Sequence, residues 1–240
     1  MKDARRALAF LTPLGGASVP TPGSLGWFPV VGAGIGAVLG VAWWGMAKVW
    51  PPAVGAAVVV ALDLGLTGML HVDGLVDSAD GLLAHLTRER RLAVMREPTV
   101  GAYGTAAGGA ALLARFAALF SARPSVLLLV ALWTASRTVM AVVATWAPYA
   151  RGQEGGLVHA FIGSRGAGVA ALATGVAIAV AAAVVYRPLA GTAALGAGAF
   201  AAAAVVWLAV RRLGGFTGDV LGAAGVALET VGLVVAAARW

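Results

Sequence analysis

Three aspartates, Asp73, Asp77 and Asp80, fall close together in a chain that has only ten acidic residues. At about 100° per residue, their spacing places them within about 60° of one another on one face of a helix. Like charges stacked on one helical face repel each other, so a counter-charge is needed. Carboxylate oxygens are the ligands that Mg²⁺ or Mn²⁺ prefers. The three aspartates are therefore predicted to hold a divalent metal, and a solvated helix end is the alternative.

Arginines and glycines elsewhere in the chain suit the binding of phosphate. A guanidinium can hold two phosphate oxygens at once, and the backbone N–H groups of glycine-rich turns can face an anion. The residues predicted to bind phosphate are Arg88, Arg91, Arg115, Arg137, Arg151, Gly101, Gly104, Gly215 and Gly218. For the arginines of the 88–91 run, anchoring to lipid headgroups is the alternative.

A fourth carboxylate, Asp219, lies within the second glycine cluster and joins the other three as a predicted catalytic residue. A metal that faces arginines is the arrangement needed to move or cleave a phosphate ester. The chain has no cysteine, so thiolate chemistry and disulfides are excluded. His71 precedes the acidic cluster and is predicted to point to the opposite helical face from Asp73. A base or a ligand is one interpretation of it, and a helix-packing residue is the alternative.

The composition predicts that these residues are positioned by helices in a membrane. Hydrophobic residues make up 60% of the chain and charged residues 11%, whereas an ordinary soluble domain has about a quarter charged residues. Seven apolar segments are long enough to span a bilayer, at about 28–50, 53–70, 101–120, 125–147, 167–186, 189–210 and 220–238. The second can continue as one helix into the acidic motif. The predicted fold is all-α, a polytopic membrane bundle forming a single domain over residues 1–240.

The basic residues between these segments predict the topology. Eleven of them belong to one set of connections: Lys2, Arg5, Arg6, Arg88, Arg90, Arg91, Arg96, Arg151, Arg165, Arg211 and Arg212. Four belong to the other set: Lys48, Arg123, Arg187 and Arg239. Because cytoplasmic loops carry the excess of Lys and Arg, the N-terminus and the acidic motif are predicted to be cytoplasmic, with Trp240 on the far side. The net charge of +7 is then explained by topology and needs no nucleic acid.

Four ionisable residues fall inside the apolar segments, namely Asp63, Arg115, Arg137 and Glu229. Charged groups at membrane depth are costly and are usually functional or paired. Ion pairs between the two arginines and the two acids would be structural. Phosphate or nucleotide binding is the interpretation preferred here for Arg115 and Arg137.

The stretch His71-Val-Asp-Gly-Leu-Val-Asp-Ser-Ala-Asp-Gly81 resembles the His-x-Asp-Gly-Leu-x-Asp-x-x-Asp-Gly signature of the cobalamin synthase family. Four other segments resemble the family's motifs in the same order. They are Arg88-Glu-Arg-Arg-Leu with Met95, Val100-Gly-Ala-Tyr-Gly104, Pro148-Tyr-Ala-Arg151 and Gly214-Gly-Phe-Thr-Gly-Asp-Val-Leu-Gly222. The resemblance therefore extends over most of the chain.

The resemblance implies an enzyme of cobalamin (vitamin B12) biosynthesis, an adenosylcobinamide-GDP ribazoletransferase with Mg²⁺ as its cofactor. Such an enzyme joins α-ribazole, or its 5′-phosphate, to the cobinamide phosphate of adenosylcobinamide-GDP and releases GMP. The implied location is the bacterial cytoplasmic (inner) membrane, with the active-site loops facing the cytoplasm. The expected partners are the two substrates and membrane lipids, without nucleic acid. Assembly into a homo-oligomer is left open.

Position by position, the resemblance carries the family's carboxylates onto this chain. The matched residues are Asp73, Asp77, Asp80, Asp219 and Glu229, and the first three are the implied metal ligands. The family often has a second acid shortly before the glutamate, where this chain has Val226, and an aspartate where this chain has Glu97. Neither departure removes the first acidic cluster.

Two other functions were weighed against this one. A CDP-alcohol phosphotransferase also uses an aspartate-rich helix, but its signature has an Ala-Arg pair after Asp-Gly, and the residues after Asp73-Gly are Leu75 and Val76. A transporter lined by Asp63, Arg115 and Arg137 would leave the acidic cluster unexplained. A transport assay and a GMP-release assay on the same protein distinguish a transporter from a transferase.

Overall fold

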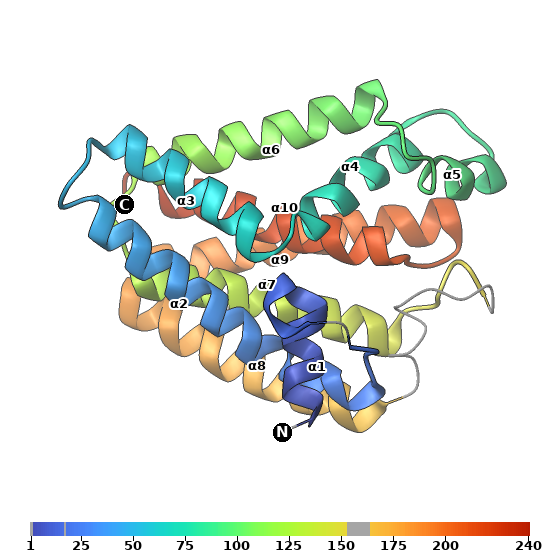
Figure 1. Cartoon of the computed structure of the whole chain (residues 1–240), viewed down its shortest axis with the longest axis horizontal. Helices are drawn as coiled ribbons and strands as arrows, with labels where there is room; N and C mark the ends of the chain where they lie inside the picture. Colours follow the sequence, from blue (N-terminus) through green and yellow to red (C-terminus); the bar gives the residue numbers. More distant parts are fainter. Residues whose placement is uncertain (1, 17, 153–163) are drawn as a thin grey trace.

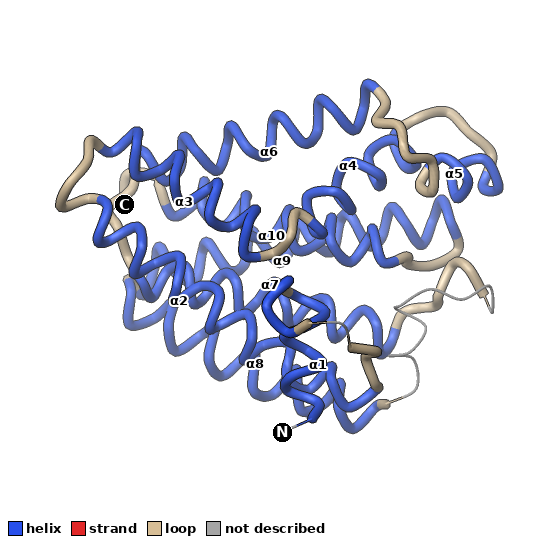
Figure 2. The backbone as a smooth tube through the Cα atoms, viewed as in Figure 1, coloured by secondary structure: helices blue, strands red, loops and turns tan. Residues whose placement is uncertain are grey.

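A computed structural model describes residues 2–16, 18–152 and 164–240 of the chain. Within these residues every regular element is a helix, which confirms the predicted all-α class (Figure 1 and Figure 2). The elements are α1 (Lys2–Leu11), η1 (Pro13–Gly15), η2 (Pro22–Trp27), α2 (Phe28–Met46), α3 (Pro52–Leu66), α4 (Leu70–Leu83), α5 (Arg88–Val94), α6 (Ala102–Ser121), α7 (Val126–Trp146), α8 (Arg165–Tyr186), α9 (Pro188–Leu213) and α10 (Gly218–Ala236).

Within the described part of the chain, six helices are long and apolar enough to cross a membrane. They are α2 with the preceding turn η2, and α6, α7, α8, α9 and α10. The bent pair α3 and α4 makes a seventh span if it is counted as one. Hydroxyl caps fix where some of these helices begin. Ser125 accepts the N–H of Leu128 at the start of α7, and Thr217 accepts that of Val220 at the start of α10.

The predicted continuation of the second span into the acidic motif is wrong, because the chain bends by 88° between α3 and α4. Gly68 and Met69 both adopt left-handed backbone conformations, with φ of 57° and 60°. The hydroxyl of Thr67 donates to the carbonyl of Asp63 at 2.8 Å, which helps to end α3. An α-helix cannot continue through two left-handed residues. The acidic motif therefore lies on its own short helix, whose first turn carries Asp73.

Helix α10 lies at the centre of the bundle, in contact with α4, α6, α7 and α9 (Figure 1). Its approach to α4 is close at Gly74, where a Cβ would lie 2.7 Å from the carbonyl oxygen of Asp219. A larger residue would push the two helices apart. This contact holds the acidic motif against the start of α10.

The helix ends gather in two groups at opposite ends of the bundle (Figure 1). One end carries α5, the starts of α6 and α8, the end of α7 and the turn between α9 and α10. The opposite end carries the connections α2–α3, α6–α7 and α8–α9, together with the C-terminus. This grouping matches the two sets of connections that the basic residues predict. Which end faces the cytoplasm stays a prediction.

Candidate active site

The fourth carboxylate predicted from the sequence lies with the acidic motif. Asp219 is in the first turn of α10, and its Oδ2 accepts a 3.1 Å hydrogen bond from the hydroxyl of Thr217. Asp77 on α4 lies within electrostatic range of Asp73, Asp80 and Asp219. The crossing of α4 and α10 thus gathers several negative charges at one place.

Two loops that are far apart in the sequence pair beside these carboxylates. The N–H of Ala150 donates to the carbonyl of Phe216 at 2.9 Å, and the N–H of Phe216 donates to that of Pro148 at 2.8 Å. A Cβ on Gly215 would overlap the carbonyl oxygen of Pro148, so glycine is needed there. This pairing brings Arg151 to Asp219, and the two form a 3.0 Å ion pair between Nη2 and Oδ2.

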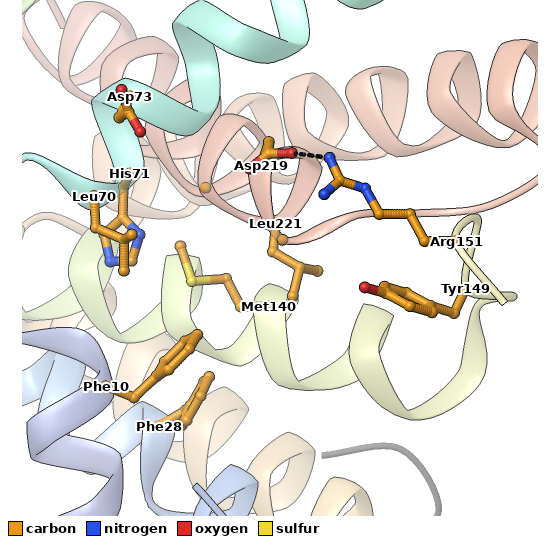
Figure 3. Close-up of a pocket in the computed structure, with 12 residues that line it drawn as sticks. Phe10, Phe28, Leu70, His71, Asp73, Met140, Tyr149, Arg151, Asp219 and Leu221 are labelled. Carbon is orange, nitrogen blue, oxygen red and sulfur yellow. Dashed lines mark hydrogen bonds and ion pairs between the residues drawn. The ribbon is translucent and has the colours of Figure 1, made fainter. Parts of the chain in front are cut away.

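A cavity of about 200 Å³ opens next to this ion pair (Figure 3). It is lined by Phe10, Phe28, Leu70, His71, Asp73, Met140, Tyr149, Arg151, Gly218, Asp219, Leu221 and Gly222. Asp73, Asp219 and Arg151 make its wall polar on the side of α10, whereas Phe10 and Phe28 make it aromatic on the opposite side. Both His71 and Asp73 border the cavity, so the prediction that they point to opposite faces of the helix does not separate them in space.

Asp80 is placed differently from the other members of the acidic motif. Its carboxylate is buried and accepts the N–H groups of Gly101 at 2.7 Å and Gly104 at 2.9 Å, at the start of α6. A Cβ on Gly101 would lie 2.5 Å from Asp80 Oδ1, and one on Gly104 would overlap Oδ2. The two glycines predicted to offer N–H groups to phosphate therefore offer them to Asp80, which caps α6.

Two arginines predicted to bind phosphate hold backbone carbonyls instead. Arg88 donates from Nε to Leu213 at 2.7 Å and from Nη2 to Ala150 at 2.8 Å. Arg91 is buried, and its Nη1 donates to the carbonyls of Gly81 and Leu82 at the end of α4. In this structure the two arginines fasten α5 to the segments that carry the site.

Arg115 and Arg137 lie in a buried cluster of charges between α3, α6, α7 and α10. Arg115 pairs at 2.6 Å with Asp63 through Nη1 and at 2.6 Å with Glu229 through Nη2. Arg137 pairs with the other oxygen of Glu229, and Nε1 of Trp133 donates to Asp63 at 3.0 Å. The two positive and two negative charges balance. This arrangement favours the structural alternative for all four ionisable residues over phosphate binding.

Some residues near the cavity carried no signal in the sequence. Phe10 and Phe28 stack with ring centroids 5.7 Å apart, but this contact joins α1 to α2 and cannot be read from spacing. Tyr149 stands two residues before Arg151 in a matched segment, which was a usable signal; burial raises the pKa of its phenol. Arg96 lies within electrostatic range of both Tyr149 and Asp219.

The carboxylates are of the type that a magnesium ion prefers, but they do not form a complete site by themselves. Among the described residues, no three His, Asp or Glu side chains form a ready-made metal site. Mg²⁺ usually takes only one or two carboxylates and fills its other positions with water and substrate phosphates. Asp73 and Asp77, next to the charge of Asp219, suit such a site.

Comparison with known proteins gives one consistent result. The CobS family model, described as cobalamin-5-phosphate synthase, matches residues 3–237. A Chlorobium phaeovibrioides protein named adenosylcobinamide-GDP ribazoletransferase is 37% identical over 204 residues, which cover 83% of this chain and 81% of that protein. A protein with the same name from Chlorobaculum tepidum is 36% identical, and the match covers 92% of this chain and 91% of that protein. Another, from Deinococcus radiodurans, is 38% identical, and the match covers 90% of this chain and 78% of that protein. No solved structure matches the chain.

Proposed function

The chain belongs to the cobalamin-5-phosphate synthase family, and on that premise we propose that its transfer reaction takes place at the polar side of the cavity. It is a transferase of cobalamin biosynthesis built as a multi-pass membrane bundle. The proposed substrates are adenosylcobinamide-GDP, for which its relatives are named, and α-ribazole or its 5′-phosphate. The observation that carries the proposal is the loop pairing that sets Arg151 against Asp219, beside Asp73.

Asp73 and Asp77 are the proposed ligands of Mg²⁺, with the remaining positions left to water and pyrophosphate oxygens. When bound, Mg²⁺ supplies positive charge that offsets the charge of the pyrophosphate and of the departing GMP. Asp80, expected as the third ligand, is proposed to anchor α6 to α4, because its oxygens already accept the N–H groups of Gly101 and Gly104.

Arg151 and Asp219 are the proposed partners of the reacting groups. Arg151 donates from Nη2 to Asp219. Its buried Nε has no hydrogen-bond partner among the described residues and suits a pyrophosphate oxygen. Asp219 is proposed to take the proton from the attacking ribose hydroxyl. The attacking hydroxyl is not the 5′-hydroxyl, because in α-ribazole 5′-phosphate the 5′-oxygen already carries a phosphate.

We propose direct transfer in a single displacement. The ribose oxygen forms a bond to the phosphorus nearer the corrin, and the bond from that phosphorus to the bridging oxygen breaks, with GMP taking the electron pair. Positioning and electrostatic stabilisation are sufficient for phosphoryl transfer of this kind. The chain has no cysteine, and the described cavity contains no serine in its wall to form a covalent intermediate.

The assignment is tested by GMP release from purified protein in detergent, with adenosylcobinamide-GDP and α-ribazole, with and without Mg²⁺. Release is expected to need both the acceptor and the ion. In Asp219→Asn, the rate is expected to fall by about 10²–10⁴-fold, the usual contribution of a general base. Wild-type turnover in Asp219→Asn would show that Asp219 is not the general base. GMP release in the absence of Mg²⁺ would show that the reaction does not need the metal.

Direct transfer has its own test, since one in-line displacement inverts the configuration at phosphorus. A substrate with a chiral thiophosphate next to the corrin is expected to give the inverted product. Net retention, or a phosphorylated protein trapped in the absence of acceptor, would contradict a single displacement.

The proposed location is the bacterial cytoplasmic membrane, with the end that carries α5 and the cavity facing the cytoplasm. The larger set of basic residues at that end supports this orientation. Both substrates and Mg²⁺ would then reach the site from the cytoplasm.

A further inference from the structure

Apart from its charged groups, the cavity is lined by apolar and aromatic groups from five helices. Phe10 of α1 stacks on Phe28 of α2, with the ring planes 16° apart, and Met140 of α7 lies next to them (Figure 3). Leu70 and Leu221 complete this wall. Aromatic faces and a methionine sulfur are the usual surroundings of a planar aromatic ligand. Phosphate and sugar groups are not suited to such a surface.

The size of the cavity limits what enters it. An apolar protein cavity of about 150 Å³ takes one benzene molecule, and this cavity measures about 200 Å³. A fused two-ring heteroaromatic base is of this scale, whereas a corrin macrocycle or a whole guanine nucleotide is much larger. Guanine and adenine in the other substrate are also two-ring bases, but their exocyclic amino and carbonyl groups would be left without partners against this apolar wall. The base of α-ribazole carries no such groups, so it is the one that fits both the size and the lining.

A buried histidine supplies a polar group within this otherwise apolar region. His71 is only 5% exposed, and its Nε2 has no hydrogen-bond partner among the described residues. Figure 3 shows its imidazole extending from α4 toward α7, the helix that carries Met140. Gly222 lets α10 pack on the backbone of His71, since a Cβ there would lie 3.1 Å from His71 Cα. A buried polar atom without a partner is uncommon and costly in a folded protein, and a ligand atom would satisfy it.

We propose that this cavity binds the heteroaromatic base of the acceptor nucleoside, with His71 Nε2–H donating to the ring nitrogen that the sugar leaves unsubstituted. This inference rests on the function proposed above. A base attached to ribose through one ring nitrogen keeps a second nitrogen with a free lone pair, which is an acceptor for the imidazole N–H. The stacked rings of Phe10 and Phe28 then contact the base.

The proposed binding mode also orients the sugar. With the base against Phe10, Phe28 and His71, the ribose extends along the cavity toward Asp219 and Arg151. Its hydroxyls then lie beside the carboxylate proposed to take their proton. One cavity thus selects the base and presents the ribose to the phosphorus.

The test compares α-ribazole with an analogue in which the unsubstituted ring nitrogen is replaced by CH. Binding of each nucleoside to the purified protein is measured by calorimetry without the second substrate, so the result does not depend on turnover. Loss of one hydrogen bond is expected to weaken the binding of α-ribazole to His71→Leu by about tenfold. The analogue is expected to bind the wild type and His71→Leu equally. The matched control is His85→Leu, at an exposed histidine away from the cavity, which should bind both nucleosides as the wild type does.

Two further measurements separate this hydrogen bond from a general loss of structure. His71→Gln keeps an N–H donor and is expected to recover part of the affinity for α-ribazole. The KM for adenosylcobinamide-GDP is expected to stay within about twofold of the wild type in all three variants. Equal weakening of both nucleosides in His71→Leu, or a rise confined to the KM of adenosylcobinamide-GDP, would overturn the proposal. If α-ribazole binds as expected but no GMP is released, the proposed function fails and the binding site stands.

Discussion

Replacing Asp80 with asparagine should destabilise the protein, whereas the same change at Asp77 should spare stability and remove activity. Asp80 accepts two backbone N–H groups in a buried position, from Gly101 at 2.7 Å and Gly104 at 2.9 Å. Asparagine keeps one acceptor and turns an NH₂ group toward the other donor. Asp77 is half-buried among like charges from Asp73, Asp80 and Asp219, so its neutralisation relieves repulsion.

The size of the difference follows from these contacts. A hydrogen bond to a charged group contributes about 1.5–3 kcal/mol, so Asp80→Asn is expected to cost about 2 kcal/mol or more. For a chain of this length that corresponds to a fall of roughly 4–8 °C in the melting temperature. Asp77→Asn is expected to melt at or slightly above the wild-type temperature while losing GMP release at limiting Mg²⁺, because a proposed metal ligand is gone.

The assay is thermal unfolding in detergent at one heating rate, followed by tryptophan fluorescence, with GMP release measured on the same samples. Glu97→Gln is the matched control, since among the described residues Glu97 forms an exposed ion pair with Arg90, and such pairs contribute about 0–1 kcal/mol. An Asp80→Asn variant that melts like the wild type yet lacks activity would refute the capping role. It would return Asp80 to the set of metal ligands.

Three further predictions follow from other parts of the structure. Arg151→Lys keeps the charge but loses the planar fork, and is expected to lower kcat/KM for GMP release by at least about tenfold with little change in melting temperature; an unchanged rate would exclude Arg151 from the site. Arg115→Met leaves buried Asp63 without its arginine, while Glu229 keeps only Arg137, and is expected to cost about 3–5 kcal/mol, so normal expression and melting would refute the structural role of the cluster. A cysteine placed at exposed Thr99 should react only with reagents that reach the cytoplasm, and one at exposed Val49 only with external reagents; the reverse pattern would invert the topology.

The sequence predicted the helical class and six of the seven spans as single helices, because both depend on local composition. The seventh is reached only if the bent pair α3 and α4 is counted as one span. Apolar stretches of span length need no knowledge of their neighbours. The bend after α3 was missed because it depends on Gly68 and Met69 both adopting left-handed conformations, and a methionine gives no signal for that. The spacing of Asp73 and Asp77 on one face was likewise predictable from helical periodicity.

The rest of the site depends on contacts between segments far apart in the chain. The spacing of Asp80 within its motif predicts a metal ligand. Its carboxylate instead accepts the N–H groups of Gly101 and Gly104, which lie 21 and 24 residues later in the chain at the start of α6. The guanidinium of an arginine suits phosphate, a carbonyl or a carboxylate equally well by type, so only the fold distinguishes Arg88 and Arg115 from Arg151. Residue types and their spacing therefore identified the charged residues that could form a site. They did not show which of these residues remain free of protein partners and open to a substrate.

The central claim is that the loop pairing makes Arg151 and Asp219 parts of one catalytic site, and a double-mutant cycle on GMP release tests it most directly. Two residues that act on the same transition state are expected to show non-additive effects, whereas independent sites add. The variants are Arg151→Lys, Asp219→Asn and the double variant, with kcat/KM measured for both substrates. The account predicts that the double variant is no slower than the slower single variant within about threefold. Effects on the logarithm of kcat/KM that add in full would contradict it.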